Sequence, residues 1–179
     1  MTRRFHTPII NLIGGPGTGK STTMAGAFAE LKTRGVTAEM APEWFKGKVW
    51  EGTADILARD QFYVAAKQNR ELQKLMNTGV QVVITDCPLL LGLIYGQKEP
   101  IEFKKLIVQK FMEYNNLIIF LERIKTYDPE GRLQTEAEAR GIDVQVKEIL
   151  KYLGLDYLEI PAGSEAFVKV ADIAQKAIL

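Results

Sequence analysis

Short apolar runs and longer amphipathic segments alternate along the chain. Nearly continuous apolar runs predict strands that are buried on both faces, and they cover residues 8–13, 36–41, 80–86, 116–121 and 157–160. The intervening segments have apolar residues at helical spacing and predict helices, which cover about residues 20–34, 54–78, 89–95, 101–114, 142–153 and 164–178. Strands that alternate with helices predict a three-layer α/β domain with a parallel sheet.

Turn and capping residues mark the ends of the predicted helices. Gly35 and Gly79 each follow the last periodic residue of a helix, a position where glycine is favoured. Thr53 and Ser164 precede helices and are candidate N-caps. Residues 44–50 are short and aromatic, and the sequence leaves an irregular and a helical conformation open for them.

The segment 54–78 carries two amides on its apolar stripe. At 100° per residue, one face of the helix holds Leu57, Gln61, Val64, Gln68, Leu72 and Leu75. A buried amide needs hydrogen-bond partners. Either a nucleobase edge or neighbouring backbone can supply them. Gln61 and Gln68 are therefore candidate substrate-binding residues.

A glycine-rich turn follows the first predicted strand. Residues 14–21 have the pattern G-x-x-x-x-G-K-S of a P-loop, between a buried strand and a helix. The backbone N–H groups of such a loop, and the positive end of the helix, bind phosphate. The residues expected to hold the phosphates of ATP are Gly15, Pro16, Gly17, Thr18, Gly19, Lys20, Ser21 and Thr22. Lys20 is expected to act on the β- and γ-phosphates.

A carboxylate, Asp86, ends the third predicted strand. An apolar strand followed by a carboxylate is a Walker B arrangement, so we expect Asp86 and Ser21 to hold Mg²⁺. The alternative is that Asp86 caps the segment that begins at Pro88. Cys87 follows Asp86, where hydrolytic P-loop ATPases usually carry a glutamate. Its presence favours phosphoryl transfer to an acceptor over hydrolysis.

A second carboxylate, Glu43, follows the second predicted strand. Ligands of such sheets bind at the carboxyl ends of the strands, so Glu43 is the leading candidate for the base that accepts a proton from an acceptor hydroxyl. Asp86 is the rival for that role. The alternative for Glu43 is a surface carboxylate at the start of a helix. Trp44 and Phe45 beside it are candidates for stacking on an acceptor base.

Residues 122–141 are polar and rich in charge, and we predict that they form a lid. Phosphoryl transfer depends on charge neutralisation and on exclusion of water, which suits the arginines Arg123 and Arg132. The alternative is a solvated loop in which Arg140 pairs with Glu136 at helical spacing.

Composition limits the possible functions. A chain of 179 residues with 46% hydrophobic and 25% charged residues predicts one globular domain, residues 1–179. Lys and Arg number 23 against 22 Asp and Glu, so no basic excess announces a nucleic-acid or membrane surface. One cysteine and one histidine exclude a disulfide framework and a zinc site, and predict a cytoplasmic protein. No apolar run is long enough to span a bilayer, and the basic N-terminus lacks the features of a signal peptide.

Taken together, several motifs resemble one family. The matching stretches are residues 14–21, 41–45, 60–63 with Gln68, 85–91 and 131–136. They are similar to the small P-loop kinase-like ATPases common in phage genomes, which are related to the nicotinamide-riboside kinase domain and more distantly to deoxynucleoside and thymidylate kinases.

The resemblance implies a five-stranded sheet in the order 2-3-1-4-5, ATP and Mg²⁺ as cofactors, and a phage-encoded protein in the host cytoplasm. Deoxynucleoside kinases carry Glu-Pro after strand two and an arginine after the strand-three carboxylate, whereas this chain has Pro42-Glu43 and Asp86-Cys87. Another residue must then hold the acceptor, and the candidates are Arg59, Lys46 and Lys48. Some phages also encode P-loop kinases of 5-hydroxymethyl-uracil in DNA, and this chain is similar to them in size and layout.

The leading hypothesis is an ATP-dependent kinase that acts on a nucleoside, a nucleotide or a modified base in DNA. A regulatory ATPase or nucleotide-dependent switch that acts on a protein or DNA partner is the alternative. A nucleotide-binding module without chemistry is a third possibility. The sequence leaves the acceptor and the oligomeric state open.

Overall fold

The computed structural model describes residues 4–53, 59–124, 127 and 134–179. Its centre is a five-stranded sheet in the order β2-β3-β1-β4-β5, in which every neighbouring pair is parallel. The predicted α/β class and strand order are thus confirmed. The strands are β1 Pro8–Ile13, β2 Ala38–Ala41, β3 Val82–Thr85, β4 Asn115–Glu122 and β5 Leu158–Pro161.

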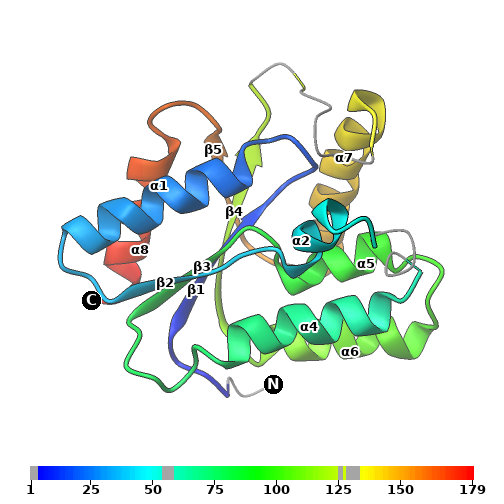
Figure 1. The fold of residues 1–179 in the computed structure, drawn as a ribbon, viewed down its shortest axis with the longest axis horizontal. Helices are drawn as coiled ribbons and strands as arrows, with labels where there is room; N and C mark the ends of the chain where they lie inside the picture. The colour runs from blue at the N-terminus through cyan, green and yellow to red at the C-terminus, as the bar shows by residue number, and fades with distance from the viewer. Residues whose placement is uncertain (1–3, 54–58, 125–126, 128–133) are drawn as a thin grey trace.

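Helices cover both faces of the sheet (Figure 1). Helices α1 and α8 lie on one face, and α4, α5, α6 and α7 lie on the other. The helical segments are α1 Lys20–Thr33, α2 Trp44–Trp50, α4 Gln61–Gln73, η1 Leu89–Leu91, α5 Gly92–Tyr95, α6 Ile101–Met112, α7 Glu136–Tyr152 and α8 Ala166–Ala177. The segment 44–50, left open by the sequence, is therefore helical.

The two hydrophobic cores follow the alternation of side chains along the strands. In β1, Ile9 and Ile13 belong to the core under α4, α6 and α7, while Ile10 and Leu12 belong to the core under α1 and α8. All four are at most 2% exposed. A strand buried on both faces reads as a continuous apolar run, which explains why β1 was predictable.

Three predicted helix starts were wrong. Asp60, and not Thr53, caps α4, because its carboxylate accepts a hydrogen bond from the Tyr63 N–H at 2.9 Å. Glu165 occupies the N-cap of α8 in place of Ser164. Helix α7 begins at Glu136, six residues before the predicted start at 142, because Thr135 and Glu138 form a capping box.

Candidate active site

The P-loop connects β1 to α1. Gly17 and Gly19 have φ of 77° and 93°, a left-handed conformation that only glycine adopts at little cost. Lys20 Nζ donates hydrogen bonds of 2.8 Å to the carbonyls of both Gly14 and Gly15. Burial lowers the pKa of the Lys20 ammonium, and the Glu43 and Asp86 carboxylates oppose that shift. The lysine is thus held on the loop that its motif predicts.

Asp86 joins the P-loop helix to the turn after β2. Its side chain is 3% exposed. Its Oδ2 accepts a hydrogen bond from Ser21 Oγ at 2.6 Å, and its Oδ1 accepts one from the Glu43 N–H at 2.9 Å. The cap position before η1 is Pro88, without a side-chain bond. The capping alternative for Asp86 therefore receives no support from the geometry.

The oxygen atoms of Ser21 and Asp86 fit a magnesium ion. Both are hard ligands of the kind Mg²⁺ prefers, and Mg²⁺ is usually bound by one or two protein groups plus phosphates and water. The described residues hold no group of three His, Cys, Asp or Glu side chains that could bind a metal without such help. The donor set thus suits a metal that arrives with a nucleotide.

Glu43 lies at the junction between the P-loop and helix α2. Burial raises the pKa of its carboxyl group, the Lys20 ammonium opposes the shift, and Asp86 adds to it. Burial also raises the pKa of the neighbouring Cys87 thiol and Tyr95 hydroxyl, so both stay protonated at neutral pH. Among these groups, Glu43 is the one whose ordinary pKa is shifted towards neutral pH from below.

A cavity of about 400 Å³ runs from the P-loop to helices α2, α4 and α5. Its phosphate-binding end is formed by the P-loop, Asp86 and Glu43. Its other end is mainly apolar and is lined by Phe45, Lys46, Val49, Trp50, Gln61, Val64, Leu91 and Tyr95. This space therefore has a polar and an apolar half that meet at Glu43.

Two of the predicted acceptor-binding side chains are engaged elsewhere. Gln68 is 3% exposed, and its amide accepts from the Trp44 N–H at 3.0 Å and donates to the Pro42 carbonyl at 3.2 Å. Backbone, and not a base edge, therefore satisfies this amide. The Trp44 ring packs edge-on against Tyr63 and does not line the cavity. Gln68 and Trp44 fix the turn after β2 together.

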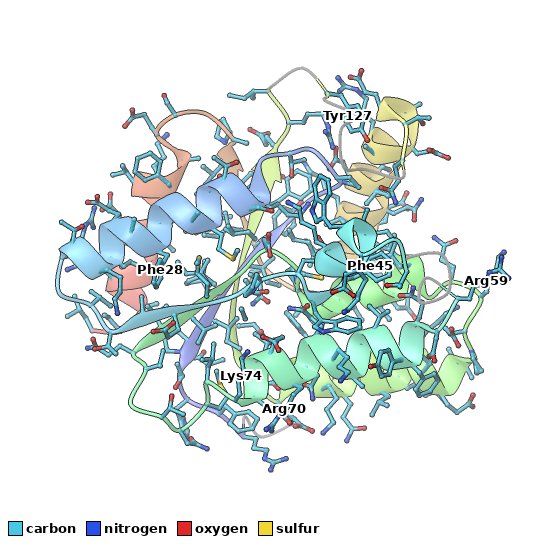
Figure 2. The ribbon with its side chains drawn as sticks, in the orientation of Figure 1. Phe28, Phe45, Arg59, Arg70, Lys74 and Tyr127 are labelled. Atoms are coloured by element: carbon cyan, nitrogen blue, oxygen red, sulfur yellow. The ribbon has the colours of Figure 1, made fainter. Side chains whose placement is uncertain are left out.

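The remaining acceptor candidates divide between the cavity and the surface. Gln61 and Lys46 line the cavity. Arg59 is exposed, and in Figure 2 its side chain extends outward at the edge of the molecule, away from the P-loop. Lys48 pairs with Glu51 at 2.6 Å. The geometry leaves Lys46 as the candidate cation at the acceptor end.

The predicted lid residues have different surroundings. Arg123 directly follows β4, its side chain is 4% exposed, and it pairs with Asp143 of α7 at 3.1 Å. Arg132 lies outside the described residues. Arg140 pairs with Glu136 at 2.8 Å on the exposed face of α7, as the solvated alternative predicts. The first part of α7, residues 136–141, is therefore helix and not loop.

Sequence reasoning missed Trp50, Tyr95 and Asp143. Trp50 was within reach, because residues 45, 46, 49 and 50 share one face of a helix, and all four line the cavity. The segment had only to be read as helical. Tyr95 and Asp143 carry no local signal, because the fold brings them to the site from distant parts of the chain.

The parallel sheet, the P-loop and the Asp86 pairing define the chain as a nucleotide-binding P-loop domain. More particularly, residues 9–166 match the family model described as an AAA domain. Because that match covers most of the sequence, the chain belongs to this family. No curated protein matches the sequence.

The chain is also similar to a solved structure, titled the crystal structure of NadR protein in complex with NR. The TM-score is 0.70 and the identity is 17%. The match covers 98% of this chain and 52% of that one, so this chain spans about half the length of the NadR protein. At this identity the likeness shows the fold, which is that of a P-loop kinase-like protein. No helix in the described part of the chain is long and apolar enough to cross a membrane.

Proposed function

We propose that the chain is an ATP-dependent kinase that transfers the γ-phosphoryl group to a hydroxyl group of a nucleoside-like acceptor. The observation that carries the proposal is the continuous cavity, in which a P-loop and an apolar chamber meet at a buried carboxylate. A hydrolytic ATPase needs only water beside the phosphates. A chamber lined by Phe45, Trp50 and Tyr95 suits a planar organic molecule.

The donor half binds the triphosphate. The P-loop N–H groups and Lys20 neutralise phosphate charge, and Ser21 and Asp86 hold Mg²⁺, which supplies further neutralisation of the charge that develops on transfer. The acceptor hydroxyl oxygen attacks the γ-phosphorus, its proton passes to a Glu43 carboxylate oxygen, and ADP leaves. The raised pKa of Glu43 makes it a better proton acceptor near neutral pH.

The charge of the lining favours a hydroxyl acceptor over a phosphate acceptor. Its described cations are Lys20 and Lys46, and its carboxylates are Glu43 and Asp86. Lys20 serves the donor phosphates, so Lys46 alone remains to face a phosphomonoester that would lie beside the Glu43 carboxylate. A second dianion next to a carboxylate is repelled, whereas a neutral hydroxyl donates a hydrogen bond to it.

The test is an acceptor panel with radiolabelled ATP. The panel contains nucleosides, nucleoside monophosphates, NR and DNA that carries 5-hydroxymethyl-uracil. We expect slow turnover of ATP alone and faster turnover with a hydroxyl-bearing acceptor, which becomes labelled. Transfer to monophosphates in preference to nucleosides would contradict the hydroxyl assignment. Acceptor-independent hydrolysis that a protein or DNA stimulates would instead favour a regulatory ATPase.

A further inference from the structure

Helix α7 contacts the first residues of the P-loop. A Cβ on Gly15 would collide with the carbonyl of Ala139, which is fully buried, so helix and loop meet there backbone to backbone. One turn further along α7, Asp143 Oδ1 accepts a hydrogen bond from the Gly15 N–H at 2.5 Å. A carboxylate from a distant helix therefore binds the phosphate loop directly.

The other oxygen of Asp143 holds Arg123. Arg123 Nε and Nη2 donate to Asp143 Oδ2 at 3.2 and 3.1 Å. The third nitrogen, Nη1, is buried and has no hydrogen-bond partner among the described residues. A buried charged donor without a partner is costly, and in a native protein it often marks the place of an absent ligand.

The unpartnered nitrogen faces the phosphate loop. Arg123 Nη1 lies 3.2 Å from the position that a Cβ on Gly17 would occupy, and Gly17 lines the cavity. The Tyr127 ring lies 3.0 Å from that same position, and the Arg123 guanidinium is 5.8 Å from its centroid. Because Nη1 has almost no exposed area, an anion that reaches it has to displace a neighbouring group, and Tyr127 contacts both sides of that path (Figure 2).

We propose that Asp143 is a positioning residue for the nucleotide phosphates. It holds Arg123 by two nitrogens so that the third points at Gly17, and its bond to Gly15 keeps the loop in register with helix α7. A guanidinium held in this way loses less freedom when it binds an anion, which strengthens the binding. The proposal rests on the proposed function only in requiring that a nucleotide polyphosphate binds at the P-loop.

The variant Asp143→Asn separates the two contacts of the carboxylate. Its amide oxygen still accepts from the Gly15 N–H, but its amide NH₂ faces the guanidinium as a second donor. Affinities for ATP, ADP and AMP are measured by calorimetric titration of the full chain with Mg²⁺. We expect D143N to weaken ATP and ADP by about tenfold, the loss of one charge-assisted hydrogen bond. The affinity for AMP should change less than about twofold, since AMP does not fill the polyphosphate site.

The double variant shows whether Asp143 acts through Arg123. In an Arg123→Met background, D143N should cause no further loss of the ATP-to-AMP affinity ratio. The same loss in both backgrounds, or an equal loss for all three nucleotides, would overturn the proposal. Glu136→Gln is the matched control, because it makes the same chemical change in an exposed arginine pair on the same helix. We expect it to leave all three affinities unchanged.

Folding is checked by circular dichroism at the assay temperature. If D143N is unfolded there, Arg123→Lys carries the test, because lysine keeps the charge but cannot be held by two nitrogens. A lower ATP-to-AMP ratio in R123K supports the proposal, and an unchanged ratio overturns it. A wild-type chain that binds no ATP at all would sink the proposed kinase function, whereas ATP binding with an unchanged ratio in D143N sinks only the role of Asp143.

Discussion

The two halves of the cavity are built in different ways. At the phosphate end, specific hydrogen bonds fix each functional side chain, such as Lys20 to the loop carbonyls and Asp86 to Ser21. At the acceptor end, helix α2 carries no buried residue, and the cavity wall consists of partly exposed side chains such as Phe45 and Trp50. The donor site is thus specified by bonds, whereas the acceptor site is specified by shape and apolar area.

Removal of the P-loop lysine should have the largest effect on that comparison. Lys20→Ala is expected to lower phosphoryl transfer by about a thousandfold or more, since it removes a charge that stabilises the transferring phosphate. The melting temperature should stay close to that of the wild type, because the lysine bonds only two loop carbonyls. Transfer and thermal unfolding are measured on the same sample. A large loss of stability would assign Lys20 to the fold.

Glu43→Gln should have the next largest effect. A lost general base costs about a hundredfold or more in kcat, while the KM for ATP should change little. Because the pKa of Glu43 is raised, wild-type activity should fall as the pH drops through that pKa, and this acidic limb should vanish in E43Q. Equal losses in kcat and in ATP affinity would place Glu43 in nucleotide binding instead.

The same substitution has a consequence for stability. A carboxyl group whose pKa is higher in the folded than in the unfolded chain favours folding at low pH and opposes it as the pH rises through the folded pKa. E43Q should therefore be more stable than the wild type at pH 8, and this advantage should shrink towards pH 4. Melting temperatures across that range provide the measurement.

Trp50→Ala should affect the acceptor half alone. Trp50 is 70% exposed and lines the cavity, so its loss should leave stability almost unchanged. An aromatic stacking contact is worth about 0.5–1.5 kcal/mol, which corresponds to a rise of up to about tenfold in the acceptor KM. The KM for ATP should not change. A matched Tyr152→Ala variant, at an 89% exposed position on α7, should change neither constant.

Gln68→Ala should have the smallest effect on activity. It leaves the Trp44 N–H without its acceptor, which costs about 1–3 kcal/mol of stability. The acceptor KM should rise only a few-fold, through displacement of α2. Gln68→Glu keeps the oxygen for Trp44 and should retain more stability than the alanine variant. A kcat loss as large as that of E43Q, with normal stability, would instead return Gln68 to the substrate.

The sequence predicted best what depends on local pattern. Strands such as β1 are buried on both faces, so their apolar runs were unambiguous, and the P-loop motif placed Lys20 and Ser21 at the end of β1 and the start of α1. Asp86 could also be placed beside Ser21, because carboxyl ends of neighbouring parallel strands meet at one edge of the sheet. The observed Ser21–Asp86 bond agrees with that geometry.

Contacts between distant segments could not be predicted in this way. A polar sequence around residue 136 concealed the start of α7, although its Thr135–Glu138 capping box was a readable signal. The approach of Asp143 to Gly15 depends on how α7 packs across the sheet, which no local pattern encodes. Similarly, only the turn after β2 shows that backbone groups claim the Gln68 amide.

Helix α2 offers an opening for protein engineering. None of its residues is buried, so substitutions along it cost little folding free energy. A library randomised at Phe45, Lys46, Val49 and Trp50 would therefore sample new acceptor pockets while the phosphate machinery stays intact. By the same reasoning, natural relatives can diverge in acceptor without passing through unstable intermediates, and α2 is the segment where such divergence is expected to accumulate.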